Sequence, residues 1–267
     1  MNNQNNIIKE ICSEQHILYE SLSQGYIVRL TKGDFSRHIF GAYWDINSAV
    51  ADRIACDKTA CYTLLENSGI PAIKHELIFN PIHRYDYIQK DGEWSRATDF
   101  FKHYKKVVVK PNQGTKGQGI FLCQTQAEFE AAVYSVFAEH PDAALSPYHE
   151  IENEYRVFYI GGNCRFVYGK AKDRTWQHNL SQGATAFEVS DENKLTVLKT
   201  LASRAAKCIG ITFATVDIAE SPTGERAVME INSGIQSKHL LEQLPHLRPV
   251  IKGVFGEAVG LMFGEAQ

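Results

Sequence analysis

The stretch VVVKPNQGTKGQGIF, residues 107–121, guides the interpretation of the whole chain. A run of valines ends at Lys110, and three glycines then fall within six positions, with a lysine among them. Glycine at this density is typical of a backbone whose N–H groups approach a ligand more closely than a side chain would allow. Phosphate is the natural ligand for a loop that is both bare and positively charged.

Two well-known phosphate loops do not match this stretch. A Walker A loop requires G-x-x-x-x-G-K-[ST], and a dinucleotide fingerprint requires G-x-G-x-x-G at the start of a helix, whereas the order here is G-x-x-G-x-G. Residues 120–123 predict a strand, and residues 124–140 predict a helix with Thr125 as N-cap and Glu128 as its capping-box partner. The glycines therefore join two strands as a flap. Taken alone, the pattern also fits an ordinary surface hairpin.

Composition and charge exclude several classes of protein. The chain has 267 residues and a net charge of -3, without a block of Lys and Arg, so nucleic acid is not expected as a partner. No apolar run is long enough for a signal peptide or a membrane span, which predicts a cytoplasmic protein. The six cysteines form no C-x-x-C pair and the ten histidines form no metal-binding pattern, so a disulfide scaffold and a zinc site are disfavoured.

Helical and strand patterns alternate along the chain. A single helix is expected over 46–69, a short one over 98–104 and a long one over 190–210, followed by mostly helix after residue 232. Strands are expected at 26–30, 74–79 and 106–110, in a pair over 154–172 that turns at Gly161-Gly162, and in a hairpin around 222–225. Short antiparallel pairs between helices favour an α+β chain of two lobes over a doubly wound parallel sheet.

The last hairpin contains three oxygen-bearing side chains in apolar surroundings. Asp217 interrupts an apolar strand, and Glu230 and Asn232 lie two apart on the returning strand, so they share one face. Asp217 shares that face if the strands pair across the turn. Such a set suits Mg²⁺ that is also held by phosphates. The alternative is that Asp217 caps a turn and the other two line a solvated strand.

Several basic and acidic residues also lie in apolar segments or at strand ends. A cluster of Lys and Arg facing Asp, Glu and Asn is what ATP, a metal ion and an anionic intermediate require. Taken individually, each fits an ordinary surface charge. The candidates are Lys58, Lys110, Glu154, Arg156, Lys170, Lys172 and Arg174.

These motifs together resemble the ATP-grasp superfamily. The segments ACDKTACYTLLENSGIPA, VVVKPNQGTKGQGI, EYRVFYIGG, ATVDIAE and MEINSG follow in that superfamily's order, and the similarity covers residues 27–245. The flavour is that of cyanophycin synthetase and bifunctional glutathione synthetase, and NLSQGA is similar to a segment of the ribosomal-protein glutamate ligases. The resemblance implies two lobes, each with an antiparallel sheet and helices, with ATP between them and a truncated N-terminal domain. The implied division is 1–50, 51–145 for the lobe with the flap, and 146–267 for the lobe with the metal site.

The resemblance implies a role for each motif residue. Lys58 and Lys110 would contact the α- and β-phosphates of ATP, and Glu154 would bind the ribose. The flap over the phosphates would comprise Gly114, Lys116, Gly117 and Gly119. The hinge beside adenine would comprise Pro147, Tyr148 and Glu150. Two Mg²⁺ ions, or Mn²⁺ instead, would be held by Asp217, Glu230 and Asn232. The transferring phosphoryl group would be steadied by Arg156 and by Lys172 or Arg174.

The implied activity is that of a carboxylate–amine ligase. ATP would phosphorylate a substrate carboxylate, and an amine from an amino acid or peptide would displace the phosphate from the acyl phosphate. Two alternatives stay open, a kinase acting on a small hydroxyl compound and an ATP-binding module without catalysis. Because fewer than 60 residues precede Lys58, a partner chain, a second copy in a homodimer or an unusually small substrate is expected to replace the missing domain.

Overall fold

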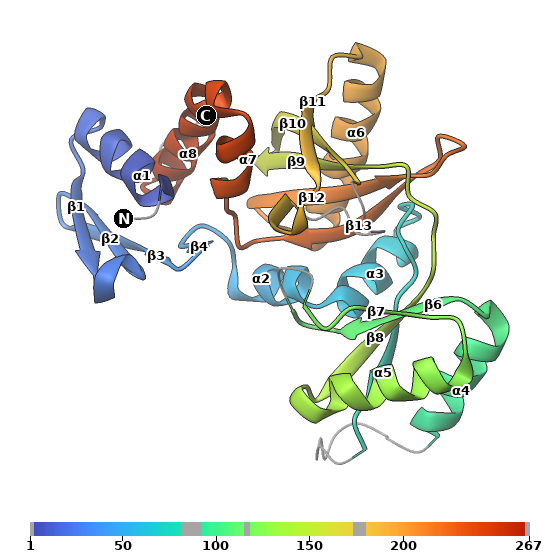
Figure 1. Ribbon diagram of the computed structural model, residues 1–267. Coiled ribbons are helices and arrows are strands. Elements are labelled where there is room, and N and C mark those ends of the chain that lie inside the picture. Colours follow the sequence, from blue (N-terminus) through green and yellow to red (C-terminus); the bar gives the residue numbers. More distant parts are fainter. Residues whose placement is uncertain (1–2, 82–91, 115–117, 173–179, 265–267) are drawn as a thin grey trace.

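The computed structural model describes residues 3–81, 92–114, 118–172 and 180–264 (Figure 1). These residues form three sheets whose strands all pair in the antiparallel direction, with helices on their faces, so the α+β prediction is confirmed. None of the helices in the described ranges combines the length and apolar character needed to cross a lipid bilayer.

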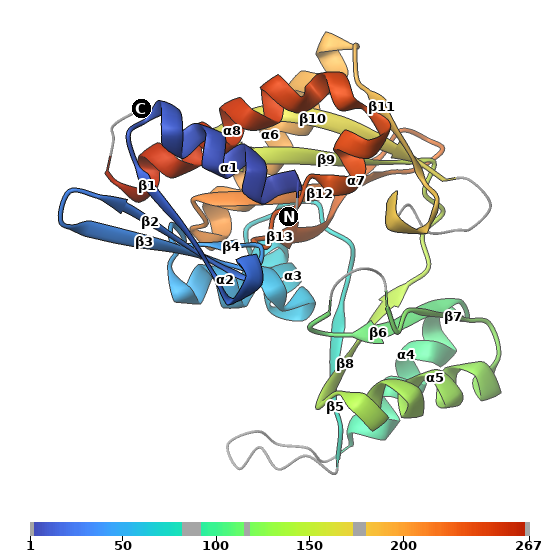
Figure 2. The ribbon, with the colours of Figure 1, turned by 60° about the vertical axis from the view of Figure 1, so that its left-hand side comes forward.

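The N-terminal sheet is joined to the C-terminal helix. After α1 (Asn3–Glu14), strands β1 (Leu18–Leu22), β2 (Ile27–Lys32), β3 (Phe35–Phe40) and β4 (Tyr43–Trp44) pair in that order. Figure 2 shows α1 running beside α8 (Arg248–Met262), close to the large sheet. Sequence analysis predicted only one strand here, since the outward-facing residues of β1 and β3 leave little apolar periodicity.

The small sheet carries the flap. Its order is β5 (Glu76–Phe79), β8 (Asp142–Pro147), β6 (Val107–Pro111) and β7 (Phe121–Cys123). Helices α4 (Glu93–Tyr104) and α5 (Gln126–Glu139) cover it, and α5 begins with the predicted capping box of Thr125 and Glu128. The predicted helix over 98–104 starts earlier, and strand β8 was not predicted.

The large sheet has the order β11 (Thr185–Glu188), β10 (Asn163–Ala171), β9 (Asn153–Ile160), β12 (Phe213–Glu220) and β13 (Arg226–Asn232). Helix α6 (Glu192–Ile209) packs on one face together with α2 (Ala49–Cys56) and α3 (Lys58–Asn67). Short elements complete the chain: η1 (Ser23–Gly25), η2 (Leu180–Gln182), α7 (Lys238–Gln243) and η3 (Pro245–Leu247).

The single helix predicted over 46–69 is wrong. Asp57 has an extended backbone, with φ -102° and ψ 107°, which ends α2. Its side chain accepts hydrogen bonds from the Ala60 N–H and the Thr59 hydroxyl, so it serves as the N-cap of α3. This break makes Lys58 the first residue of a new helix.

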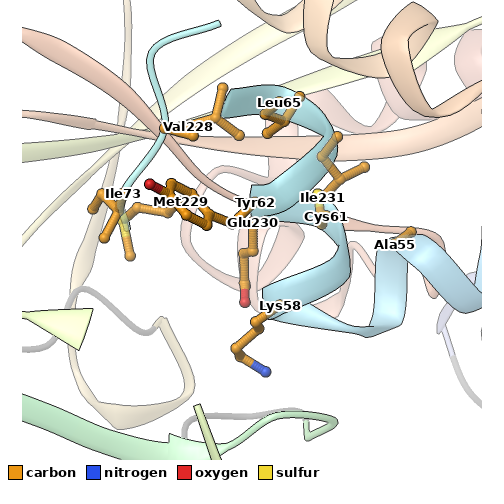
Figure 3. Close-up of a pocket in the computed structure, with 11 residues that line it drawn as sticks. Ala55, Lys58, Cys61, Tyr62, Leu65, Ile73, Val228, Met229, Glu230 and Ile231 are labelled. Atoms are coloured by element: carbon orange, nitrogen blue, oxygen red, sulfur yellow. The ribbon is translucent and has the colours of Figure 1, made fainter. Parts of the chain in front are cut away.

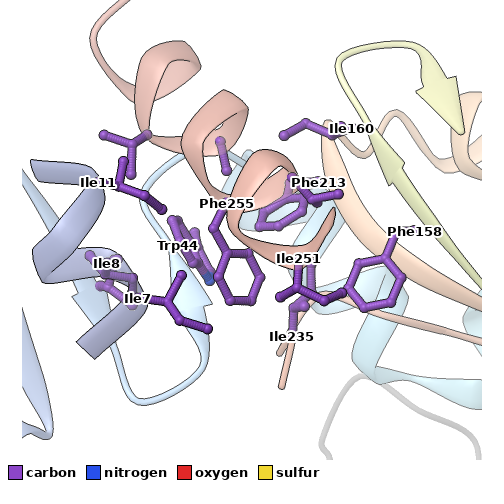
Figure 4. Packing of buried hydrophobic residues seen from close by; sticks show 14 of the residues in the cluster. Ile7, Ile8, Ile11, Trp44, Phe158, Ile160, Phe213, Ile235, Ile251 and Phe255 are labelled. Carbon is purple, nitrogen blue, oxygen red and sulfur yellow. The ribbon is translucent and has the colours of Figure 1, made fainter. Parts of the chain in front are cut away.

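Period-2 alternation divides the large sheet between core and site. On one face of β9, Phe158 and Ile160 join a cluster that contains Trp44, Phe213 and Phe255 (Figure 4). Arg156 and Glu154 continue the same face beyond that cluster, where no helix covers them. The boundaries proposed at residues 50 and 145 stay a prediction.

Candidate functional site

A cleft of about 490 Å³ lies between the small and large sheets. Its small-sheet side includes the end of β6, the described parts of the flap and the end of β8. Its large-sheet side includes polar residues of β9, β10, β12 and β13. Ten predicted site residues line it: Lys58, Lys110, Gly114, Pro147, Tyr148, Glu154, Arg156, Asp217, Glu230 and Asn232.

Two lysines face the cleft without a carboxylate partner. Within the described part of the chain, neither Lys58 nor Lys110 forms an ion pair. The Nζ of Lys58 donates to the carbonyl oxygens of Asn112 and Gly114, both at 3.3 Å, and so ties the start of α3 to the flap. Burial, together with the neighbouring charge of Lys58, lowers the pKa of Lys110 to about 8. The pair therefore forms a cationic surface that lacks its counter-ion.

The large sheet carries a buried network of opposite charges. Arg156 on β9 lies opposite Asp217 on β12, and its Nε donates to Asp217 Oδ1 at 2.6 Å. Lys170 on β10 lies opposite Glu154, with which it forms an ion pair, and its Nζ is 3.4 Å from Asp217 Oδ2. Burial alone would raise the pKa of Asp217, but Arg156 and Lys170 lower it to about 2. Burial raises the pKa of Glu154 to about 7, even though Lys170 opposes the shift.

The predicted metal ligands lie together. Asp217 and Glu230 are direct cross-strand partners, and a bulge follows Asp217. Asn232 Nδ2 is 3.0 Å from Glu230 Oε1 and 3.5 Å from Asp217 Oδ2, so one polar group already occupies the space between two carboxylates. Rotation of that amide would present a third oxygen to the same space. The donor set therefore fits a hard divalent cation, provided that Asp217 loosens its contact with Arg156.

A search for three or more His, Cys, Asp and Glu side chains in metal-binding geometry finds no group among the described residues. The metal hypothesis thus rests on the mixed carboxylate and amide set. Figure 3 shows that Lys58, on α3, and Glu230, on β13, extend in the same direction from neighbouring elements. A cation-binding carboxylate and a phosphate-binding lysine are therefore close enough to act on one ligand.

Next to this polar region, the cleft has an apolar slot at the end of β8. Val108, Ile120, Ile151 and Met229 contribute side chains to it. Tyr148 is held in place because its N–H donates to Lys106 O at 2.9 Å and because Lys106 Nζ lies 3.7 Å from the centre of its ring. A flat, apolar ring with polar edges fits this slot.

The remaining predicted residues lie elsewhere. Gly119, Glu150 and Lys172 are described but do not line the cleft, and Lys172 Nζ donates to Ile151 O at 3.3 Å. The other three predicted residues, Lys116, Gly117 and Arg174, lie outside the described residues.

Sequence reasoning missed part of the cleft. It noted that Lys170 and Lys172 share a face but assigned the role to Lys172, whereas Lys170 is the one inside the cleft. The cross-strand position opposite Glu154 was the available signal. The aromatic residues Tyr26, Phe40 and Tyr43, which also line the cleft, were missed because their sheet was not predicted.

Comparisons with known proteins agree with this geometry. A family profile described as an ATP-grasp domain, the third family of its clade, matches residues 46–245. A protein of Ectopseudomonas mendocina (strain ymp) named probable alpha-L-glutamate ligase is 28% identical over 200 residues, which are 73% of this chain and 60% of the relative. A protein of the same name from Azotobacter vinelandii is 30% identical over 193 residues, which are 70% of this chain and 58% of the relative. The chain thus spans less than two thirds of these relatives.

Solved structures share the fold. The D-alanine–D-alanine ligase from Bacillus anthracis has a TM-score of 0.62 at 14% identity, over 82% of this chain and 72% of that one. The D-cycloserine synthetase DcsG has a TM-score of 0.58 at 19% identity, over 78% of this chain and 71% of that one. The resemblance and the fold expected from the sequence are confirmed, and the chain belongs to the ATP-grasp family.

Proposed function

We propose that this chain is an ATP-dependent carboxylate–amine ligase that forms an amide or peptide bond through an acyl phosphate. The observation that carries the proposal is one cleft that contains both a cationic pair without counter-ions and a set of oxygen ligands. The names of the relatives, probable alpha-L-glutamate ligase, support an amino acid such as glutamate as one substrate.

The cleft residues divide the work. The apolar slot beside Tyr148 accepts adenine, and Lys58 and Lys110 neutralise the phosphates. Asp217, Glu230 and Asn232 would hold Mg²⁺, which would neutralise phosphate charge and orient the γ-phosphoryl group. Arg156 lies at the junction between the two regions. It stabilises the negative charge on the transferring phosphoryl group once Asp217 turns toward the cation.

The flap then excludes water. Its root is fixed because Asn112, fully buried, accepts the Thr59 N–H on its side-chain oxygen and the Lys58 N–H on its carbonyl. Closure over the phosphates protects the acyl phosphate from hydrolysis until the amine attacks. A cytoplasmic location, and a homodimer or partner chain, stay predictions.

A product assay tests the proposal. The protein is incubated with Mg-ATP, glutamate and a panel of amino acids and short peptides, and both free phosphate and product masses are measured. Lys110→Ala and Glu230→Ala should be inactive, whereas Lys102→Ala, which changes an exposed lysine on α4, should be fully active.

The outcomes separate the alternatives. A mass equal to acid plus amine minus water, together with free phosphate, supports the ligase. A stable phosphorylated compound without free phosphate would show a kinase instead. Binding of ATP without any turnover on the full panel would favour a module that does not catalyse.

A further inference from the structure

Three aromatic side chains of the N-terminal sheet line the end of the cleft away from the charged network. They are Tyr26, Phe40 and Tyr43, which we call the aromatic wall. Their exposed fractions are 56%, 52% and 37%. Rings left open to water beside a cleft provide apolar area that a ligand can cover.

The wall has a fixed shape. The Tyr26 and Phe40 rings meet edge to face, with centroids 4.7 Å apart and planes at 65°. Gly41 has φ +62°, and its N–H donates to Tyr26 O at 2.8 Å. A Cβ at Gly41 would lie 3.3 Å from the Tyr26 ring, so the bare backbone lets the ring lie over it. The rings are therefore positioned before any ligand binds.

The wall is also attached to the strand that carries the proposed metal ligands. Directly after Asn232, Gly234 lies against Tyr43, where an added Cβ would be 3.4 Å from Cζ of the ring. The next residue, Ile235, donates its N–H to Ala42 O at 3.0 Å. These contacts set the distance between the aromatic wall and the reacting centre.

The polar groups near the wall differ from those at the nucleotide end. Gln236, Lys238 and His239 line the cleft beside it. The acidic residues among the described lining positions are Glu154, Asp217 and Glu230, all of which belong to the charged network. An amide and two basic groups suit the carboxylate and peptide groups of a substrate, whereas the rings suit an apolar side chain.

We infer that this end of the cleft binds an amino-acid or peptide substrate through an aromatic or large aliphatic side chain. The inference rests on the proposed ligase function, because it treats the wall as part of the substrate site. Tyr26 and Phe40 determine specificity, and they act by contact with the substrate side chain rather than by chemistry.

Binding of Gly-Phe, Gly-Leu and Gly-Ala, measured by titration calorimetry in the presence of Mg-ADP, tests this without turnover. We expect Gly-Phe and Gly-Leu to bind about tenfold more tightly than Gly-Ala, as the added apolar contact predicts. Phe40→Ala and Tyr26→Ala should reduce that preference to near unity. Phe35→Ala is the matched control, because Phe35 lies on the same strand, is 71% exposed and does not line the cleft.

Each outcome decides. Equal binding of the three dipeptides to the unmodified protein overturns the inference, and so does a Phe35→Ala variant that loses the preference as much as Phe40→Ala. Mg-ATP affinity, measured on the same proteins, should be unchanged in the wall variants. If the dipeptide preference is present but no product forms, the inference stands and the ligase proposal fails.

Discussion

Lys110, at the end of β6, faces the cleft without a counter-ion in the described chain, so its charge state should control nucleotide binding. Its pKa is about 8, which makes the side chain charged below that pH and neutral above it. Because phosphate favours the charged form, binding above pH 8 requires uptake of a proton. Mg-ATP affinity should therefore be constant below about pH 8 and fall by up to tenfold per pH unit above it.

Calorimetric titrations between pH 7 and pH 9.5 measure this slope. Lys110→Met should weaken binding roughly 10- to 100-fold at pH 7, as loss of a charged hydrogen bond predicts, and should flatten the pH dependence. Lys102→Met controls for the loss of a lysine from the small lobe. A Lys110→Met protein with the original slope would show that another group titrates.

Lys170 and Lys172 point to the same side of the chain but lie in different surroundings. Lys170 is buried between Glu154 and Asp217, whereas Lys172 is exposed and contacts one backbone carbonyl. Lys170→Met would leave Glu154 buried without its partner, and should lower the free energy of unfolding by about 3 kcal/mol. Lys172→Met should change it by less than about 0.5 kcal/mol. Urea denaturation measures both, and equal losses would contradict the burial of Lys170.

The sequence predicted the positions of the site residues better than their interactions. Alternation along β13 placed Glu230 and Asn232 on one face, and the motif order identified Lys58 and Lys110. It could not show that Arg156 already binds Asp217, because strand pairing and sheet order decide that contact. It also could not distinguish Lys170 from Lys172, because that depends on where β10 leaves the cleft.

At the scale of elements, local signals succeeded where a side chain acts on its own backbone. Thr125 caps α5, Asp191 caps α6, and Gly210 ends α6 in the left-handed region, as expected. The break at Asp57 was missed because the same residue type is tolerated within a helix, and only its contacts show that it starts α3. Strand β8 was missed because its alanines have weak strand preference, so its pairing with β5 and β6 determines it.

Gly169 on β10 makes room for an aromatic ring of the neighbouring strand. It pairs with Phe187 on β11, and a Cβ at Gly169 would overlap that ring. Gly169→Ala should therefore separate β11 from the sheet and destabilise the protein by about 1 to 3 kcal/mol. Gly253→Ala in α8 meets no neighbour and should be neutral or stabilising. Chemical denaturation of both variants measures the difference, and similar stabilities would refute the overlap.

At the scale of the whole molecule, the two ends of the chain build one unit. The N-terminal sheet packs through Trp44 on Phe213 of β12 and Phe255 of α8, with ring centroids 5.4 and 5.3 Å apart (Figure 4). This unit holds the aromatic wall, while the large sheet holds the charged network. Positioning of a substrate against the reacting centre therefore depends on a core that joins residues far apart in sequence.

Trp44→Ala tests that dependence. Removal of a nearly fully buried indole should lower the free energy of unfolding by about 3 to 5 kcal/mol. At a temperature where the variant remains folded, Mg-ATP affinity should be retained, because the residues proposed to bind nucleotide lie on other elements, whereas dipeptide affinity should fall with the loosened wall. Trp94→Ala is the matched control, since Trp94 is half-exposed and stacks on Tyr134 of α5. If the two variants lose equal stability, or if Trp44→Ala weakens nucleotide and dipeptide binding alike, the N-terminal sheet does not hold the substrate end of the cleft separately.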